Sequence, residues 1–142
     1  MTAPAPPRRP PSVLFVCVAN ACRSQMAEAF ARALVGERWE IWSAGSRPAG
    51  QVHPVAIQLM EEVGLDLRSH RSKGLDAVPP RTWDVLVTMG CGDACPQVPA
   101  QTRLDWDIAD PVGRRPEEAR GIRDDLRRRV ETLLMASPPG RD

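Results

Sequence analysis

The chain has 142 residues and a formal net charge of +1. This length suits a single domain with a substantial core, and the near-zero net charge gives no general attraction to nucleic acid. No apolar run approaches the roughly 18 residues of a membrane-spanning helix, so we expect neither a nucleic acid nor a membrane as a partner.

The segment 1–11 is rich in proline and is predicted to be a flexible tail. An alternative is a secretory signal, because Arg8 and Arg9 precede an apolar stretch and Ala19-Asn20-Ala21 resembles a cleavage site. The apolar stretch is at the short limit for such a signal, and cleavage after it would leave the next helix without its strand. We therefore expect the folded domain to begin at residue 12.

Alternating strands and helices are predicted over residues 12–136, followed by a polar tail at 137–142. Short apolar, β-branched runs indicate strands, and apolar residues spaced three or four apart indicate helices. The predicted strands are 13–17, 39–44, 83–89 and 103–106, and the predicted helices are 24–36, 52–63 and 116–136, with a poor helical signal at 69–77. Strands separated by helices imply an α/β fold, a three-layer α/β/α domain with a four-stranded parallel sheet.

The last predicted helix carries one apolar stripe, formed by Ile122, Leu126, Val130 and Leu133. Arg123, Arg127 and Arg128 fall outside this stripe, so we expect them on a solvated face. Arginine is abundant in the whole chain and Lys73 is the only lysine. We interpret the arginines as a compositional bias rather than as a binding signal.

The most informative segment joins the first strand to the first helix and reads Val13-Leu-Phe-Val-Cys17-Val-Ala-Asn-Ala-Cys-Arg23-Ser24. A loop before a helix N-terminus directs backbone N–H groups and the helix dipole at its centre, where a tetrahedral oxyanion can bind. The same field favours a thiolate, so Cys17 is predicted to be a nucleophile and Arg23 an oxyanion ligand. The competing interpretation, a core cysteine beside a surface arginine, does not explain the Arg-Ser pair at the helix start.

This segment resembles the anion loop of the low-molecular-weight protein tyrosine phosphatases and of the arsenate reductases that share their fold. The resemblance continues through Ser43-Ala44-Gly45, through 84–91 and into Asp110-Pro111, and it covers about residues 12–136. It implies that Asn20 braces the loop, that Ser24 hydrogen-bonds the Cys17 sulfur, and that Asp110 is the general acid, with Asp107 second. It also implies a loop that binds the oxyanion through Val18, Ala19, Asn20, Ala21, Cys22, Arg23 and Ser24.

The surroundings of the loop distinguish the two branches of this family. In the phosphatases, tyrosines commonly follow the Asp-Pro pair, whereas here Val112-Gly113 follow it and the chain has no tyrosine. A reductase needs a second thiol, which attacks the sulfur of a thiol–arsenic adduct and releases arsenite. Cys91 and Cys95 follow a predicted strand and suit that role. We therefore favour an arsenate reductase, with a phosphatase that uses a Cys17 phosphoenzyme, or a noncatalytic oxyanion- or metal-binding module, as alternatives.

A relay among three cysteines is the expected mechanism. Cys17 attacks arsenic, Cys91 forms a disulfide with Cys17, and Cys95 then forms a Cys91–Cys95 disulfide for a small dithiol partner. Thioredoxin-coupled reductases of this fold place more than the three residues found here between the last two cysteines. Thioredoxin is the expected reductant, with a glutaredoxin-type protein or a low-molecular-weight thiol as alternatives. The mechanism requires free thiols, which the cytoplasm keeps reduced, so we expect a cytoplasmic enzyme. The three cysteines supply the electrons, so no cofactor is expected.

A cation near the loop is a separate question. The four cysteines suggest a zinc site on paper, but Arg23 would oppose a bound cation, so no metal site is expected. Some reductases of this family bind potassium near the loop, and Asn20, Glu28 and Ser43 match that pattern. Lys73 stands where an acidic group would be expected, and its ammonium is suited to take the place of the cation.

Cys22 and the two histidines complete the candidate residues. Cys22 either bridges to Cys17 or packs against the core, and packing is favoured. His53 precedes a proline at a predicted helix start and suits a capping or surface role. Neither His53 nor His70 shows the spacing of a metal ligand or of a catalytic triad, so chemistry is assigned to neither.

Overall fold

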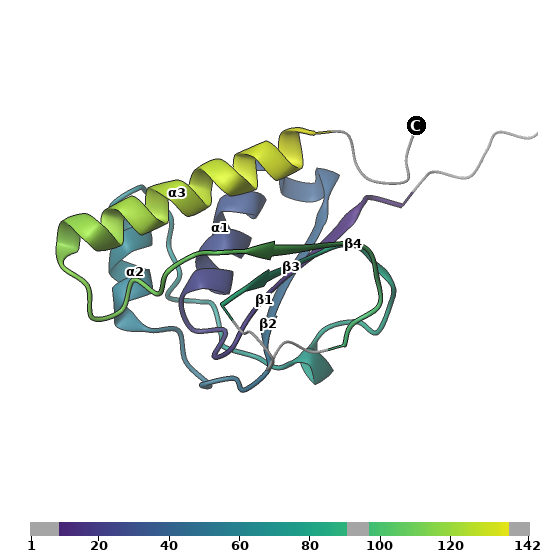
Figure 1. Cartoon of the computed structure of the whole chain (residues 1–142), viewed down its shortest axis with the longest axis horizontal. Helices are drawn as coiled ribbons and strands as arrows, with labels where there is room; N and C mark the ends of the chain where they lie inside the picture. The colour runs from purple at the N-terminus through teal and green to yellow at the C-terminus, as the bar shows by residue number, and fades with distance from the viewer. Residues whose placement is uncertain (1–8, 91–96, 137–142) are drawn as a thin grey trace, which may run out of the picture.

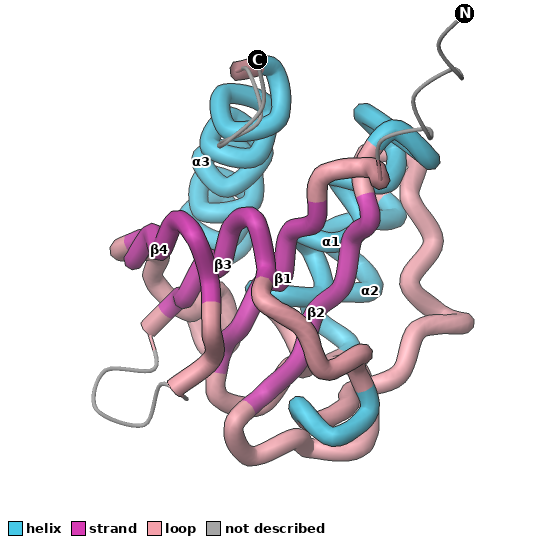
Figure 2. The backbone as a smooth tube through the Cα atoms, turned by 90° about the vertical axis from the view of Figure 1, so that its right-hand side faces the viewer, coloured by secondary structure: helices cyan, strands magenta, loops and turns pink. Residues whose placement is uncertain are grey.

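The computed structural model describes residues 9–90 and 97–136. Its elements in chain order are β1 (Ser12–Cys17), α1 (Arg23–Val35), the 3-10 turn η1 (Gly36–Arg38), β2 (Glu40–Gly45), α2 (Pro54–Glu61), the 3-10 turn η2 (Leu75–Ala77), β3 (Trp83–Met89), β4 (Ala100–Trp106) and α3 (Pro116–Met135). The strands form one parallel sheet in the order β2-β1-β3-β4, as Figure 1 and Figure 2 show. The predicted α/β fold with a four-stranded parallel sheet is confirmed.

The three helices gather on one face of the sheet (Figure 2), where α1 packs against β1, β2, α2 and α3. The core on this face includes Phe15, Met26 and Leu126, which are fully buried. The opposite face carries a smaller cluster around Leu14 and Trp83. Among the described residues, η2 and loop segments cover that cluster, so the second outer layer of the predicted three-layer arrangement consists there of a 3-10 turn and loops rather than of α-helices. β1 is therefore buried on both faces, which explains why it is apolar from Val13 to Val16.

The starts of α2 and β4 and the segment 69–77 depart from the predicted elements in an informative way, while the remaining bounds agree within two residues. α2 begins at Pro54 rather than at residue 52, because His53 caps it: the Val55 N–H donates to His53 Nδ1 over 3.1 Å. The capping role of His53 is confirmed. β4 begins at Ala100, three residues before its predicted start, because alternate residues of this edge strand are exposed and polar. The weak helical signal at 69–77 corresponds only to η2.

The prediction that Arg123 lies on a solvated face is wrong, since its side chain is only 9% exposed. Its Nη1 donates to the carbonyl of Leu59 (3.0 Å) and to Glu62 Oε1 (2.7 Å), both at the C-terminal end of α2. Unpaired carbonyls at a helix C-terminus attract a cation, so Arg123 ties α3 to α2. Arg127 and Arg128 are exposed, as predicted.

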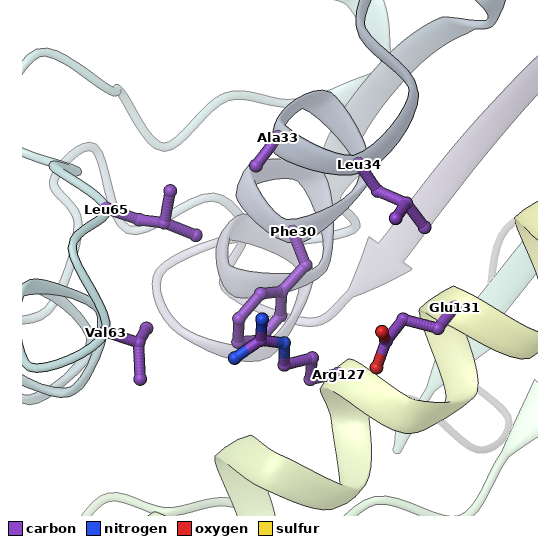
Figure 3. Close-up of a pocket in the computed structure, with 7 residues that line it drawn as sticks. All are labelled: Phe30, Ala33, Leu34, Val63, Leu65, Arg127 and Glu131. Atoms are coloured by element: carbon purple, nitrogen blue, oxygen red, sulfur yellow. The ribbon is translucent and has the colours of Figure 1, made fainter.

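A cavity of about 150 Å³ lies among α1, α3 and the chain after α2 (Figure 3). It is lined by Phe30, Ala33, Leu34, Val63, Leu65, Arg127 and Glu131. The Arg127 guanidinium lies over the Phe30 ring, 5.8 Å from its centroid. This lining contains no nucleophile, so we place the candidate site elsewhere. None of the helices in residues 9–90 and 97–136 is long and apolar enough to cross a membrane.

Candidate active site

The candidate site lies at the carboxyl edge of the sheet, where β1 ends at Cys17 and α1 begins at Arg23. Parallel strands end on the same edge, so the loops after β3 and β4 are expected there too. The loop after β4 reaches the site, because Arg23 Nη1 donates to the carbonyl of Ile108 over 2.9 Å. Cys91 and Cys95, on the loop after β3, lie outside the described residues.

The carbonyl groups of the anion loop, residues 17–22, are all bound by surrounding groups. Four of them accept backbone N–H groups from the β2–α2 region: Cys17 from Ser46 (3.3 Å), Val18 from Arg47 (2.8 Å), Ala19 from Ala49 (3.0 Å) and Ala21 from His53 (2.8 Å). The Ser72 hydroxyl also donates to the Ala19 carbonyl, over 2.6 Å. The Asn20 carbonyl accepts from Gln25 Nε2 (3.3 Å), and the Cys22 carbonyl accepts from the Met26 N–H (2.9 Å). These bonds hold the loop from the outside.

The outward carbonyls determine where the amides of the loop point. In a trans peptide, the C=O of one residue and the N–H of the next point in opposite directions, and no peptide bond described here is cis. The N–H groups of residues 18–23 therefore turn toward the centre of the loop. Within the described part of the chain, no hydrogen bond from these six amides to a protein acceptor is found. This arrangement of free donors suits an oxyanion.

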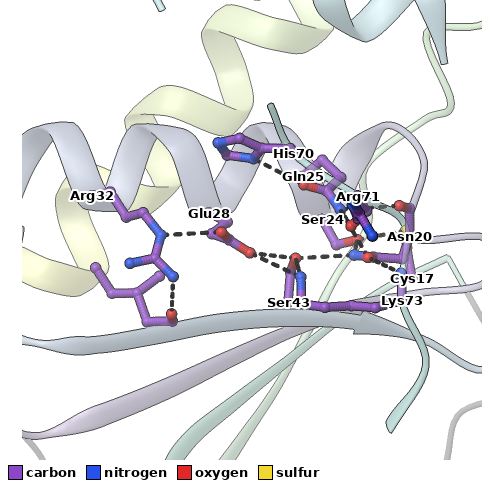
Figure 4. A network of polar contacts seen from close by, with 11 residues as sticks. Cys17, Asn20, Ser24, Gln25, Glu28, Arg32, Ser43, His70, Arg71 and Lys73 are labelled. Atoms are coloured by element: carbon purple, nitrogen blue, oxygen red, sulfur yellow. Dashed lines mark hydrogen bonds and ion pairs between the residues drawn. The ribbon is translucent and has the colours of Figure 1, made fainter. Parts of the chain in front are cut away.

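Asn20 braces the loop from within, at a positive φ of 48°. Its Oδ1 accepts from Gln25 Nε2 (2.8 Å) and from the Lys73 N–H (2.9 Å), and its Nδ2 donates to Ser24 Oγ (2.7 Å) and Ser43 Oγ (3.0 Å). Figure 4 shows this network, which ends at the sulfur of Cys17, 2.9 Å from Ser24 Oγ. Asparagine tolerates the left-handed backbone region better than most residues, so its side chain and backbone serve the same loop geometry.

A partly buried ion pair between Lys73 and Glu28 supports the other end of the network. Glu28 Oε1 accepts the Ser43 hydroxyl over 2.6 Å and lies 3.5 Å from Lys73 Nζ, which is also 3.3 Å from Ser43 Oγ (Figure 4). Burial alone would raise the pKa of Glu28. The hydrogen bond from Ser43 and the charges of Lys73 and Arg32 outweigh burial and hold this pKa below its usual value. The Lys73 ammonium therefore lies among Glu28 and Ser43, where a cation was expected.

Cys22 faces the core rather than the centre of the loop. Its side chain is buried and its Sγ lies 3.8 Å from Met26 Sδ. Burial raises the pKa of the Cys22 thiol to about 12, with further contributions from the negative charges of Asp110 and Cys17. A thiol held in this protonated form is a poor nucleophile, so the geometry supports the packing role.

Asp110 lies on the loop that Arg23 contacts. Its carboxylate is exposed, and its Oδ1 accepts the Val112 N–H over 3.0 Å. Its charge also acts on the Cys22 thiol, which places it within electrostatic reach of the anion loop. Asp107 is exposed on the same loop. Asp110 is therefore the candidate for the general acid that the electrostatics link to the anion loop, and Asp107 shares its loop.

Several supporting residues were missed by sequence reasoning. Gln25 is fully buried and donates to the Asn20 carbonyl, to Asn20 Oδ1 and, over 2.7 Å, to the carbonyl of Arg71. Its Oε1 also meets His70 Nδ1 at 3.1 Å. Gly45 is required behind the loop, because a Cβ there would lie 2.6 Å from the carbonyl oxygen of Val18. The one available signal was a polar residue, Gln25, on the apolar side of α1.

Among residues 9–90 and 97–136, no group of three or more His, Cys, Asp or Glu side chains is placed to hold a metal ion. The proposed zinc alternative included Cys91 and Cys95, which lie outside those residues. The positive groups that the structure does place near the loop are the side chains of Arg23 and Lys73.

Comparison with known proteins gives a consistent result. A family model described as low molecular weight phosphotyrosine protein phosphatase matches residues 12–137. An arsenate reductase of Staphylococcus xylosus is 37% identical over 128 residues, covering 87% of this chain and 96% of that protein. A solved arsenate reductase in the phosphate binding state has a TM-score of 0.78 and 36% identity, covering 88% of this chain and 97% of that one. The thioredoxin-dependent arsenate reductase of Corynebacterium glutamicum has a TM-score of 0.72 and 34% identity, covering 88% of this chain and 60% of that one.

Proposed function

Because this chain belongs to the low-molecular-weight phosphotyrosine protein phosphatase family, we propose that its anion loop serves an arsenate reductase, which converts arsenate to arsenite. The observation that carries the proposal is the inward-facing set of amides around the buried Cys17 sulfur, in a chain whose relatives are named arsenate reductases. Arsenate is a tetrahedral oxyanion of the kind such a loop binds. Arg23, at the helix N-terminus, adds a charged donor fork.

In the first step, the Cys17 thiolate attacks arsenic while Asp110 donates a proton to the departing oxygen, which leaves as water. The product is a covalent thiol–arsenic adduct in which arsenic is still pentavalent. The Ser24 hydroxyl, 2.9 Å from Cys17 Sγ, stabilises the thiolate form of Cys17 by a hydrogen bond. The amides of residues 18–23 and the Arg23 guanidinium hold the remaining oxygens.

In the second step, the Cys91 thiolate attacks the Cys17 sulfur and the S–As electron pair moves to arsenic. Arsenite leaves with the two electrons that the thiols have lost, and a Cys17–Cys91 disulfide remains. Cys95 then attacks Cys91, which frees Cys17 and leaves a Cys91–Cys95 disulfide. A small dithiol protein of the thioredoxin type returns the two electrons, and the cytoplasm is the compartment that keeps such thiols reduced.

A phosphatase is the second candidate, because hydrolysis requires only Cys17, Arg23 and an acid. The residues after Asp110-Pro111 make the phosphatase function less favourable, because Val112 and Gly113 provide no aromatic side chain to pack against a phenyl ring. The relatives described above are named reductases, and the thioredoxin dependence of one of them supports the choice of reductant.

Arsenate-dependent oxidation of a reduced dithiol protein tests the proposal directly. Purified protein is mixed with reduced thioredoxin, a reduced glutaredoxin-type protein or a low-molecular-weight thiol, with and without arsenate, and arsenite is measured. We expect one arsenite for each disulfide formed, no arsenite from Cys17→Ser, and no multiple turnover from Cys91→Ser or Cys95→Ser. Slow hydrolysis of an aryl phosphate should survive in the last two variants. Hydrolysis without any arsenate-dependent thiol oxidation would assign the phosphatase function instead.

A further inference from the structure

Gly90, the residue after β3, lies against the guanidinium of Arg23. A Cβ built on Gly90 would lie 2.2 Å from Arg23 Nη1, 3.1 Å from Cζ and 3.4 Å from Nη2. The first distance is far inside van der Waals contact, so the guanidinium occupies the space that any side chain at position 90 would need. Gly90 also has a positive φ of 68°, which favours glycine for a second reason.

The same guanidinium nitrogen, Nη1, is also held by the loop after β4. Arg23 Nη1 donates to the carbonyl of Ile108 over 2.9 Å, and Ile108 is itself 4% exposed. The Ile108 N–H in turn donates to the carbonyl of Trp106 over 3.0 Å, and this bond holds Ile108, with its own carbonyl, at the end of β4. The guanidinium therefore lies at the ends of two neighbouring strands, where Nη1 meets both the bare α-carbon of Gly90 and a fixed acceptor, the Ile108 carbonyl.

This placement leaves donors for a ligand. A guanidinium has five N–H groups, and the Ile108 carbonyl is the single acceptor found for it within residues 9–90 and 97–136. The remaining N–H groups include the pair on Nε and Nη2, which form the fork that binds two oxygens of a tetrahedral anion. A fork is useful only when it is aimed, because an oxyanion in the loop must meet both of its donors together with the loop amides.

We propose that Gly90 is a positioning residue for oxyanion binding, acting through Arg23. Because Gly90 has no side chain, the Arg23 guanidinium can lie against it at the end of β3 and donate to the Ile108 carbonyl. Together these two contacts aim the free Nε and Nη2 donors at the centre of the anion loop. The inference rests on the proposed function only in taking that loop as the substrate site. A Cβ at position 90 is accommodated by movement of the flexible Arg23 side chain, so the protein still folds while the fork is displaced.

Binding of inorganic phosphate, measured by titration calorimetry, isolates this role. Gly90 precedes Cys91, so arsenate turnover alone would mix an effect on Arg23 with an effect on the thiol relay, whereas phosphate binding needs no second thiol. We expect Gly90→Ala to weaken phosphate binding by about 10- to 100-fold, the range of a lost hydrogen bond to a charged group. Gly90→Asn is a second variant, because asparagine tolerates a positive φ but also carries a Cβ.

Gly64→Ala is the matched control, because Gly64 has a φ of 83° but no atom lies within 4 Å of its built Cβ. It should carry a similar backbone penalty and leave phosphate affinity within about twofold of the parent value. In an Arg23→Lys background, which lacks the fork, Gly90→Ala should have little further effect. The kcat for aryl phosphate hydrolysis should fall less than the KM rises in the Gly90→Ala protein.

The outcomes separate this inference from the proposed function. Unchanged phosphate affinity in both Gly90 variants would overturn the positioning role and leave the reductase proposal intact. If Gly90→Ala reduced phosphate affinity equally in the Arg23→Lys background, the positioning role would also be overturned, because the effect would then not depend on the Arg23 guanidinium. Absence of phosphate binding by the parent protein would reject the anion site itself, and both proposals with it.

Discussion

The Ser24 hydroxyl lies 2.9 Å from the sulfur of Cys17, Oγ to Sγ, and donates to it when the sulfur is a thiolate, because a thiolate can only accept. The neighbouring contacts orient the Asn20 amide beside this hydroxyl. The Lys73 backbone N–H can only donate, so the Asn20 atom that it meets must be Oδ1, and Asn20 Nδ2 must face Ser24. Ser24 Oγ accepts from that amide, and its own proton is available to a Cys17 thiolate. The loop is thereby arranged to stabilise negative charge on Cys17.

Ser24→Ala should therefore slow the chemistry of Cys17. A hydrogen bond to a charged group contributes about 1.5–3 kcal/mol, so we expect alkylation of Cys17 by iodoacetamide at pH 7 to fall by about 10-fold or more. Arsenate kcat/KM should fall in parallel. Ser43→Ala is the matched control, because Ser43 accepts from the same Asn20 amide but belongs to the Glu28 end of the network. Equal alkylation rates in the parent and Ser24→Ala proteins would contradict the role of this hydroxyl.

Asp110→Asn should reduce the rate of adduct formation and leave phosphate affinity nearly unchanged. A general acid typically contributes about 10²- to 10⁴-fold to rate, and an amide of the same shape has no acidic proton to give. Single-turnover formation of the Cys17–arsenic adduct measures this step. Asp107→Asn is the comparison, because Asp107 lies on the same exposed loop. A greater loss in Asp107→Asn than in Asp110→Asn would exchange the two assignments.

Glu28 should make stability depend on pH in the acid range. Its pKa is lower in the folded protein than the usual 4.5, so the unfolded state binds the proton more readily. Its contribution is therefore fully present above about pH 4.5 to 5 and is lost as the pH falls through the folded pKa. Urea unfolding of the parent and of Glu28→Gln from pH 7 to pH 3 measures it. The free energy of unfolding should fall less steeply with acid in Glu28→Gln, and parallel curves would show that Glu28 is not the titrating group.

The position of the final disulfide tests the relay beyond the described residues. After one turnover with arsenate and no reductant, the parent protein should hold a Cys91–Cys95 disulfide and a free Cys17. Cys95→Ser should instead be trapped with Cys17 bridged to Cys91, because its resolving thiol is gone. Alkylation followed by peptide mapping identifies each bridge. A Cys17–Cys22 bridge as the main arsenate-dependent product would remove Cys91 from the mechanism, although the buried Cys22 thiol with its raised pKa makes that outcome unexpected.

The sequence by itself determined the features that depend on neighbouring residues. The β-branched run ending at Cys17 and the helical spacing after Arg23 predict β1, the anion loop and α1, and the structure places them over Ser12–Cys17 and Arg23–Val35. Strands alternating with helices predict a parallel sheet, because a connection between parallel strands must cross a face of the sheet and needs about a dozen residues or more, usually a helix. Cys17 and Arg23, which stand at the two ends of the loop, could be predicted from the same local pattern.

Only the tertiary structure decided which distant groups complete the loop. Ser72 and Lys73 are 53 residues from the loop atoms that they bind, and no local periodicity relates them to it. Ile108 is 85 residues from Arg23, and the need for glycine at position 90 appears only when the guanidinium occupies the space beside it. Arg123 shows the same limit, because a charged residue looks solvated until the carbonyls of another helix are placed against it. Local sequence specifies which segments form, whereas the partners of a buried polar group depend on how those segments pack.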